Sequence, residues 1–115
     1  MRRGFYFIGT HQHDRDGNQF YGPHLEEGSI EEYGRLFIHR KIEHAWCRTG
    51  WRLSHTNTGA AIVADVDLKS ARLLAKKLQP FKLWDIKTYE EISEACKDMD
   101  NPEVVKIMEL RHLRA

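Results

Sequence analysis

Glycine-containing turn signals divide the first two thirds of the chain into segments of strand length. The clearest pair is 51–56, WRLSHT, and 60–65, AAIVAD, which flank Asn57-Thr58-Gly59. Asn and Gly tolerate the positive φ angles of tight turns, so these segments predict a β-hairpin. Alternation along the first segment places Trp51, Leu53 and His55 on one face and Arg52, Ser54 and Thr56 on the other.

A second hairpin is predicted at the N-terminus. The apolar and aromatic segment 5–10, FYFIGT, is followed by the turn signal Asp16-Gly17-Asn18 and by 19–21, QFY, as the returning strand. We expect Gly22-Pro23 to end this strand, because Gly and Pro are the strongest breakers of local structure. Segment 24–34 then becomes an exposed acidic connection.

Segment 35–47, RLFIHRKIEHAWC, is compatible with two structures. Ser29 and Glu32 form a capping box, which predicts a helical turn and suits a helix that runs into this segment. Alternation favours a strand instead, since apolar and polar side chains separate by parity. One parity holds Leu36, Ile38, Ile42 and Trp46, and the other holds His39, Lys41 and Glu43.

The last third predicts three helices. Asp67 caps the first, which runs to Gln79 before Pro80, and "FKLWDI" after it is a short strand or an extended linker. Thr88 with Glu91, and Asn101 with Pro102 and Glu103, begin the other two. We therefore expect an α+β fold: a small antiparallel sheet of about four or five strands packed against three helices, the last two at the C-terminus.

The last helix carries more apolar surface than one narrow stripe needs. Its apolar residues are Val104, Val105, Ile107, Met108, Leu110 and Leu113. A face this broad has to be buried, either against the sheet or against a second copy of the chain. The sequence therefore also raises a homodimer formed through the C-terminal helix.

Length and composition indicate one domain over residues 1–115. With 41% apolar residues, a chain of this length can bury a stable core without disulfides. The two cysteines, Cys47 and Cys96, form neither a disulfide framework nor a metal-spaced cluster, which favours a reducing compartment. The apolar run after Arg2 and Arg3 is too short for a signal peptide or a membrane span, so we expect a cytoplasmic protein without membrane contact.

The net charge of +1 conceals a strongly basic middle. Residues 35–84 carry ten Lys/Arg and three Asp/Glu, a net +7, while the segments on either side are each net −3. A contiguous block of this sign attracts nucleic acid or an acidic protein surface. The alternative is that these side chains only solvate strand and helix faces.

The basic block supplies a candidate set of contact residues. The strand–helix arrangement resembles integrase arm-binding domains in outline, and this resemblance implies that a sheet face enters a DNA groove. Phosphate contacts are expected from Arg40, Lys41, Arg48 and Arg52, and base contacts from Ser54, Thr56 or Asn57. Along the first helix, a basic stripe is formed by Lys69, Arg72 and Lys76.

The loop GTHQHDRDG offers a competing metal site. His11 and His13 could point to one side of an extended chain and bind zinc or manganese together with Asp16, Asp14 or His24. It resembles the His-x-His-x-Asp-His motif of the metallo-β-lactamase superfamily, except that Arg15 stands at a ligand position. A hairpin turn explains the same Asp and Gly residues without an ion, so we expect no metal and no cofactor.

A nuclease-like resemblance lies in the same region. Phe7-Ile8-Gly9, followed by Tyr21-Gly22, resembles the second-strand region of GIY-YIG nucleases, although the separate first strand of that family is missing. The resemblance implies metal-assisted attack on a phosphodiester, with Arg15 and Glu26 or Glu27 as the residues to test.

The functional expectation is binding rather than catalysis. The sequence contains no Gly-x-Ser-x-Gly elbow and no phosphate-binding glycine loop, and neither cysteine has an activating neighbour. We expect a small non-enzymatic binding or regulatory protein, of the kind that phages and mobile elements encode as regulators or inhibitors. The alternative is a small metal-dependent hydrolase or nuclease that uses His11, His13 and Asp16.

Overall fold

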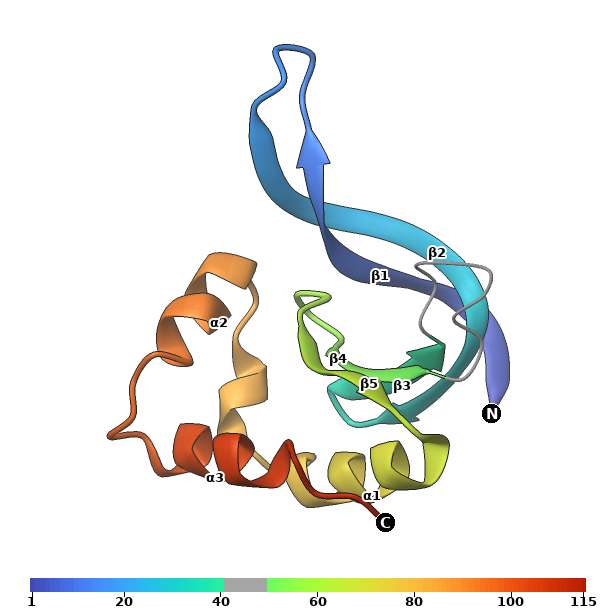
Figure 1. Ribbon diagram of the computed structural model, residues 1–115, viewed down its shortest axis with the longest axis vertical. Coiled ribbons are helices and arrows are strands. Elements are labelled where there is room, and N and C mark those ends of the chain that lie inside the picture. Colours follow the sequence, from blue (N-terminus) through green and yellow to red (C-terminus); the bar gives the residue numbers. More distant parts are fainter. Residues whose placement is uncertain (41–49) are drawn as a thin grey trace.

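The computed structural model describes residues 1–40 and 50–115 and confirms the α+β prediction (Figure 1). The described strands form one antiparallel sheet in the order β1-β2-β3-β4-β5. The strands are β1 (Arg2–His13), β2 (Gln19–Tyr33), β3 (Leu36–Arg40), β4 (Trp51–His55) and β5 (Ala61–Val66). The helices are α1 (Leu68–Leu78), the 3-10 helix η1 (Lys82–Asp85), α2 (Tyr89–Ala95) and α3 (Pro102–Leu110).

The β1–β2 hairpin is much longer than predicted, and the expected break at Gly22-Pro23 is wrong. The ladder is continuous from Arg2 opposite Ile30 to His13 opposite Gln19. Pro23 faces Gly9, whose N–H points away from β2 to the Gly59 carbonyl, 2.9 Å away. In such a pair neither N–H is needed between the two strands, so proline does not interrupt the pairing.

The predicted acidic connection over 24–34 is therefore mostly strand, and the helical turn at Ser29 does not form. Ser29 lies opposite Arg3 in the ladder with β1. Ile30 pairs with both β1 and β3, and Glu31–Tyr33 pair with β3. Tertiary pairing has overridden a local capping signal. The turn predicted at Asp16-Gly17-Asn18 is confirmed, because Asp14 accepts the N–H groups of Asp16 and Asn18 at 2.9 Å each.

The hairpin curls over one face of the sheet and projects beyond it (Figure 1). Its inner face packs against β3 through a small buried cluster of Tyr6, Ile8, Ile30 and Phe37. Gly59, in the turn between β4 and β5, meets β1 at Gly9 through the 2.9 Å hydrogen bond. The base of the hairpin is thus fixed to the rest of the sheet by the β2–β3 ladder, by this cluster and by the Gly9–Gly59 hydrogen bond.

The main core lies between the opposite face of the sheet and the helices. Alternation along β3 sends Leu36 and Ile38 to this side, while Phe37 and His39 face the hairpin, so both faces of β3 are buried. The core residues are Leu36, Ile38, Leu53, Val63, Val66, Ala71, Leu74, Ala75, Leu78, Leu83, Trp84, Ile92, Val104 and Ile107.

The three helix starts are confirmed by their caps. Asp67 accepts the Ser70 N–H at 3.1 Å, Thr88 accepts the Glu91 N–H at 3.2 Å, and Asn101 accepts the Glu103 N–H at 3.0 Å. A side-chain oxygen satisfies one of the free N–H groups in each first turn.

The segment 81–86 is neither a strand nor an extended linker, because it contains η1. The Glu103 carboxylate accepts the N–H groups of Lys82 and Leu83, both at 2.9 Å, and so caps this short helix from α3. A cap that comes from 20 residues away leaves no local signal in the sequence.

The apolar face of α3 packs within its own chain. Val104 and Ile107 are buried in the main core, and Leu110 and Leu113 pack against it. Four of the six apolar residues that raised a C-terminal homodimer are therefore covered within the same molecule, and Val105 and Met108 are partly exposed. In the described part of the chain, no helix is long and apolar enough to cross a membrane.

Candidate protein-binding surface

The outer face of the β1–β2 hairpin exposes large apolar side chains. We define this outer face as Arg3, Phe5 and Phe7 of β1 together with Leu25 and Glu27 of β2. Phe5 is 68% exposed, Phe7 55% and Leu25 52%. Phe7 lies directly opposite Leu25 and Phe5 opposite Glu27, so these side chains are neighbours on one surface.

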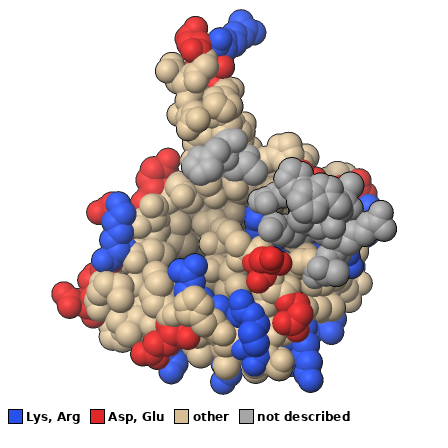
Figure 2. All heavy atoms as spheres, viewed as in Figure 1, with Lys and Arg blue, Asp and Glu red and all other residues tan. Residues whose placement is uncertain are grey.

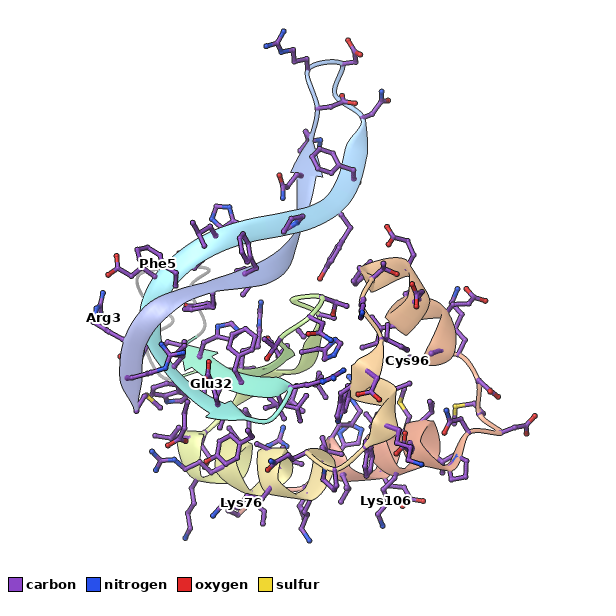
Figure 3. All side chains as sticks on the ribbon, turned by 180° about the vertical axis from the view of Figure 1, so that it is seen from behind. Arg3, Phe5, Glu32, Lys76, Cys96 and Lys106 are labelled. Carbon is purple, nitrogen blue, oxygen red and sulfur yellow. The ribbon has the colours of Figure 1, made fainter. Side chains whose placement is uncertain are left out.

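The exposure follows from the pleat of the strand. Tyr6 and Ile8 point inward to the cluster on β3 and are each 7% exposed. Successive side chains point to opposite sides, so Phe5 and Phe7 must point outward. Figure 3 shows Phe5 and Arg3 directed away from the body of the molecule.

Charged groups border this apolar surface. The Arg3 Nε lies 4.0 Å from a Glu27 oxygen, and both side chains are more than half exposed. An apolar aromatic centre with a charged rim is the anatomy of a protein–protein contact. Isolated exposed apolar residues need no explanation, but a contiguous group of them does.

The sequence predicts a strand at Phe5 and Phe7 but no binding site there. The sequence feature that points to a site is the run Phe5-Tyr6-Phe7-Ile8, which places apolar side chains on both faces of the strand. Such a run predicts a strand that is covered on both faces. In this structure the described residues cover only the face that carries Tyr6 and Ile8.

The basic block is partly neutralised by the acidic ends of the chain. Arg35 Nη1 lies 2.7 Å from Asp85, and Arg72 Nε lies 2.8 Å from Glu31. The hydrogen bond from Arg72 lowers the pKa of the Glu31 carboxyl below its usual range. Both acidic partners come from the segments that flank the basic block, so Arg35 and Arg72 are paired within the molecule.

Of the predicted phosphate contacts, the two that the structure describes, Arg40 and Arg52, lie on opposite faces of the sheet. Arg40 lies over the Trp51 ring, 4.9 Å from its centre, and this pair spans β3 and β4. Arg52 is opposite His39, on the side of the sheet that faces the hairpin. Lys41 and Arg48 lie outside the described residues.

The predicted basic stripe on α1 is present. Lys69, Arg72 and Lys76 are all exposed and three or four residues apart. Figure 2 shows basic side chains along the edge of the molecule at which Figure 1 places α1. The structure therefore brings the helical members of the predicted set together, whereas Arg52 lies on the face of the sheet opposite to α1.

The polar residues predicted to contact bases are mostly engaged in internal hydrogen bonds. Ser54 is fully buried, and its Oγ lies 2.8 Å from His39 Nε2. The Asn57 amide donates to the carbonyl oxygens of Ile86 at 3.2 Å and Trp84 at 3.4 Å. Thr56 is exposed.

The histidine-containing loop forms the tip of the hairpin. Asp14 is used in the turn, His13 is exposed, and the side chain of His11 lies outside the described set. Among the described side chains, no three His, Cys, Asp or Glu residues are grouped as a metal site.

The Ser54–His39 pair resembles a nucleophile and its base but is inaccessible. His39 Nδ1 lies 3.1 Å from the Arg40 carbonyl and donates to it, so Nε2 accepts from the Ser54 hydroxyl. Ser54 and His39 are 0% and 1% exposed. This pair satisfies buried polar groups beneath the hairpin and has no access to a substrate.

Burial lowers the pKa of His39 from 6.5 to about 4, with a smaller opposing effect from the Arg40 carbonyl. Between these values the unfolded chain binds a proton that the folded chain does not, so stability falls as pH falls from 6.5 towards 4. We expect about 2 kcal/mol to be lost at pH 5 through His39, at about 1.4 kcal/mol per pH unit.

Urea unfolding at pH 7.5 and pH 5 measures this loss. His39→Gln should reduce the difference in stability between the two pH values. A smaller difference should persist because burial also lowers the pKa of His55. An unchanged pH dependence in His39→Gln would show that His39 is not the group responsible.

Comparison of the chain with known protein families, characterised proteins and solved structures finds no match. The candidate surface is therefore interpreted from its own geometry.

Proposed function

We propose that the protein is a non-enzymatic binding or regulatory protein that acts in the cytoplasm by contacting another protein through the outer face of the β1–β2 hairpin. The observation that carries the proposal is the adjacent exposure of Phe5, Phe7 and Leu25, each more than half accessible. Aromatic side chains that enter a partner's pocket supply most of the binding energy of typical interfaces.

The chemistry of the outer face defines the partner that would fit. Phe5, Phe7 and Leu25 need an apolar surface, while Arg3 and Glu27 at the border need polar or charged groups. Contact of this kind suits a regulator or inhibitor encoded by a phage or mobile element, because such a protein can act without chemistry of its own. The burial of the Ser54–His39 pair supports binding over catalysis.

Nucleic acid is the second candidate partner. The basic stripe of α1 favours it, because Lys69 and Lys76 are exposed on one side of a helix that has no acidic residue in its first turn. Each phosphate contact would add about one unit to the salt dependence of binding. The ion pairs of Arg35 and Arg72 weaken this candidate relative to a protein partner.

A capture experiment separates the two candidates. Tagged protein is incubated with lysate of its natural host, with and without nuclease, and captured material is compared between variants. Phe5→Ser/Phe7→Ser should reduce recovery of a protein partner at least 30-fold, because a hot-spot residue contributes about 2 kcal/mol or more. Met99→Ser is the matched control, since Met99 is 57% exposed away from the hairpin.

Lys69→Glu/Lys76→Glu tests the second candidate in the same experiment. If recovery depends on this pair and disappears with nuclease, while Phe5→Ser/Phe7→Ser binds normally, the nucleic-acid function replaces the proposed one.

A further inference from the structure

β1 lies at the edge of the sheet formed by the described strands, and the direction of its backbone groups that do not face β2 can be assigned. Among the described strands it pairs only with β2. The Gly9 N–H leaves the ladder on the far side from β2 to reach Gly59. Backbone groups alternate in direction along a strand, so the N–H and C=O of Arg3, Phe5 and Phe7 also point away from β2.

This edge has a defined usable length. At Gly9 the edge is already occupied by the turn that contains Gly59. The described residues place no other strand beside 2–8. When a strand pairs antiparallel with its own copy, the middle residue of the paired segment lies on the two-fold axis. The middle residue of 2–8 is Phe5.

We propose that a second copy of this chain pairs antiparallel with β1, with Phe5 opposite Phe5, so that Arg3, Phe5 and Phe7 of the outer face lie beside the same residues of the other copy. This inference rests on the proposed function and names its partner. The pairing joins two hairpins into a four-stranded sheet with two-fold symmetry, the commonest symmetry of protein oligomers.

The side chains of the outer face are complementary to themselves in this register. The two Phe5 rings meet at the axis, and Arg3 of each copy lies opposite Phe7 of the other. An aromatic pair and two guanidinium–ring contacts are favourable cross-strand partners. Because Arg3, Phe5 and Phe7 all direct their backbone groups outward, each can also exchange hydrogen bonds with its opposite residue.

The neighbouring registers are worse. A pairing centred on Tyr6 would set Arg3 of the second copy against Gly9, where the Gly59 turn already lies. A pairing centred on Gly4 would remove the contact between the phenylalanines. In the register centred on Phe5, only Met1, which precedes β1, comes opposite Gly9.

The expected dimer is weak because its surface is small. An aromatic side chain has an area of about 200 Å², so the two partly exposed phenylalanines expose about 250 Å² per copy, and side-by-side pairing covers only part of this area. A standard interface buries about 800 Å² per partner. We expect association in the micromolar range, visible as a concentration-dependent sedimentation coefficient.

Sedimentation of the full chain tests the dimer. The unaltered protein should shift from monomer to dimer as its concentration rises from about 1 µM to about 1 mM, because this range brackets the expected dissociation constant. Phe5→Lys places two like charges on the axis and should weaken the dimer at least tenfold, whereas Met99→Lys should not. A monomer at all these concentrations would overturn the inference.

Disulfide trapping tests the register in a Cys47→Ser/Cys96→Ser background. Residues directly opposite in an antiparallel pair have Cα atoms about 5.5 Å apart, within disulfide range. Phe5→Cys should form a covalent dimer, Phe7→Cys alone should not, and a mixture of Phe7→Cys with Arg3→Cys should. Crosslinking by Phe7→Cys alone, or none by Phe5→Cys, would contradict the register.

The two proposals fail in different ways. Capture of a host protein that depends on Phe5 and Phe7, together with a monomeric chain, would remove self-pairing and keep the proposed function. A nuclease-sensitive partner together with a monomeric chain would remove both.

Discussion

Trp84→Ala is expected to lower the free energy of unfolding by about 4 kcal/mol, the loss typical of a buried aromatic side chain replaced by alanine. Trp84 is 2% exposed at the centre of the main core. Its indole Nε1 donates to the Leu78 carbonyl at 2.7 Å, so the variant also leaves the end of α1 without this partner. Chemical denaturation at pH 7.5 measures the loss.

The backbone hydrogen bond at Trp84 is kept in this variant, so the loss measures the packing of the side chain together with its indole hydrogen bond. The Trp84 carbonyl accepts a 2.7 Å hydrogen bond from His55 Nε2, and alanine retains that carbonyl. Phe20→Ala is the control, because Phe20 is 46% exposed and should change stability by less than about 0.5 kcal/mol. A loss below about 1.5 kcal/mol in Trp84→Ala would contradict the central position assigned to this side chain.

Gly59→Ala should lower the free energy of unfolding by about 3 kcal/mol, the second large effect that we expect. The loss comes from backbone strain and from a steric clash that side-chain rotation cannot relieve. Gly59 has φ +71°, and a Cβ there would lie 2.8 Å from the Gly9 nitrogen and 2.9 Å from the Ile8 carbonyl carbon. These are backbone atoms of β1, so either the turn or the hairpin has to move.

Gly17→Ala supplies the matched control for that variant. Gly17 has φ +81°, but a Cβ added there would meet no atom within 4 Å, so only the cost of positive φ applies, about 1 to 2 kcal/mol. The difference between the two variants, measured by urea unfolding, isolates the contact between the hairpin and the β4–β5 turn. Equal losses would show that this contact contributes nothing to stability.

Features encoded by neighbouring residues could be predicted from the sequence. The caps at Asp67, Thr88 and Asn101 and the turns at Gly17 and Gly59 each require only a few adjacent residues. The strand over 36–40 follows from alternation, and the rest of 35–47 lies outside the described residues.

Features decided by distant partners could not be predicted. β2 continues through Pro23 because that residue lies opposite Gly9, and η1 forms because Glu103 caps it from α3. Both partners are brought close only by the folded chain. Local signals at Gly22-Pro23 and at Ser29 therefore led to the wrong structure for 24–34.

The candidate site shows the same division. The stripe on α1 is local and was predicted, whereas the pairing of Arg72 with Glu31 joins residues 41 apart in the sequence. The outer face depends on which side of β1 the sheet covers, and no residue near Phe5 or Phe7 encodes that. Net charge by segment identified a basic block but not its internal neutralisation.

Site-specific photo-crosslinking tests the central claim most directly. A photoreactive phenylalanine analogue replaces Phe7 or Met99, which are 55% and 57% exposed, in otherwise unaltered protein in nuclease-treated host lysate. We predict a discrete protein adduct at position 7, either a second copy or a host protein, and none at position 99. Equal labelling at both positions, or no adduct at position 7, would contradict a protein-binding role for the outer face.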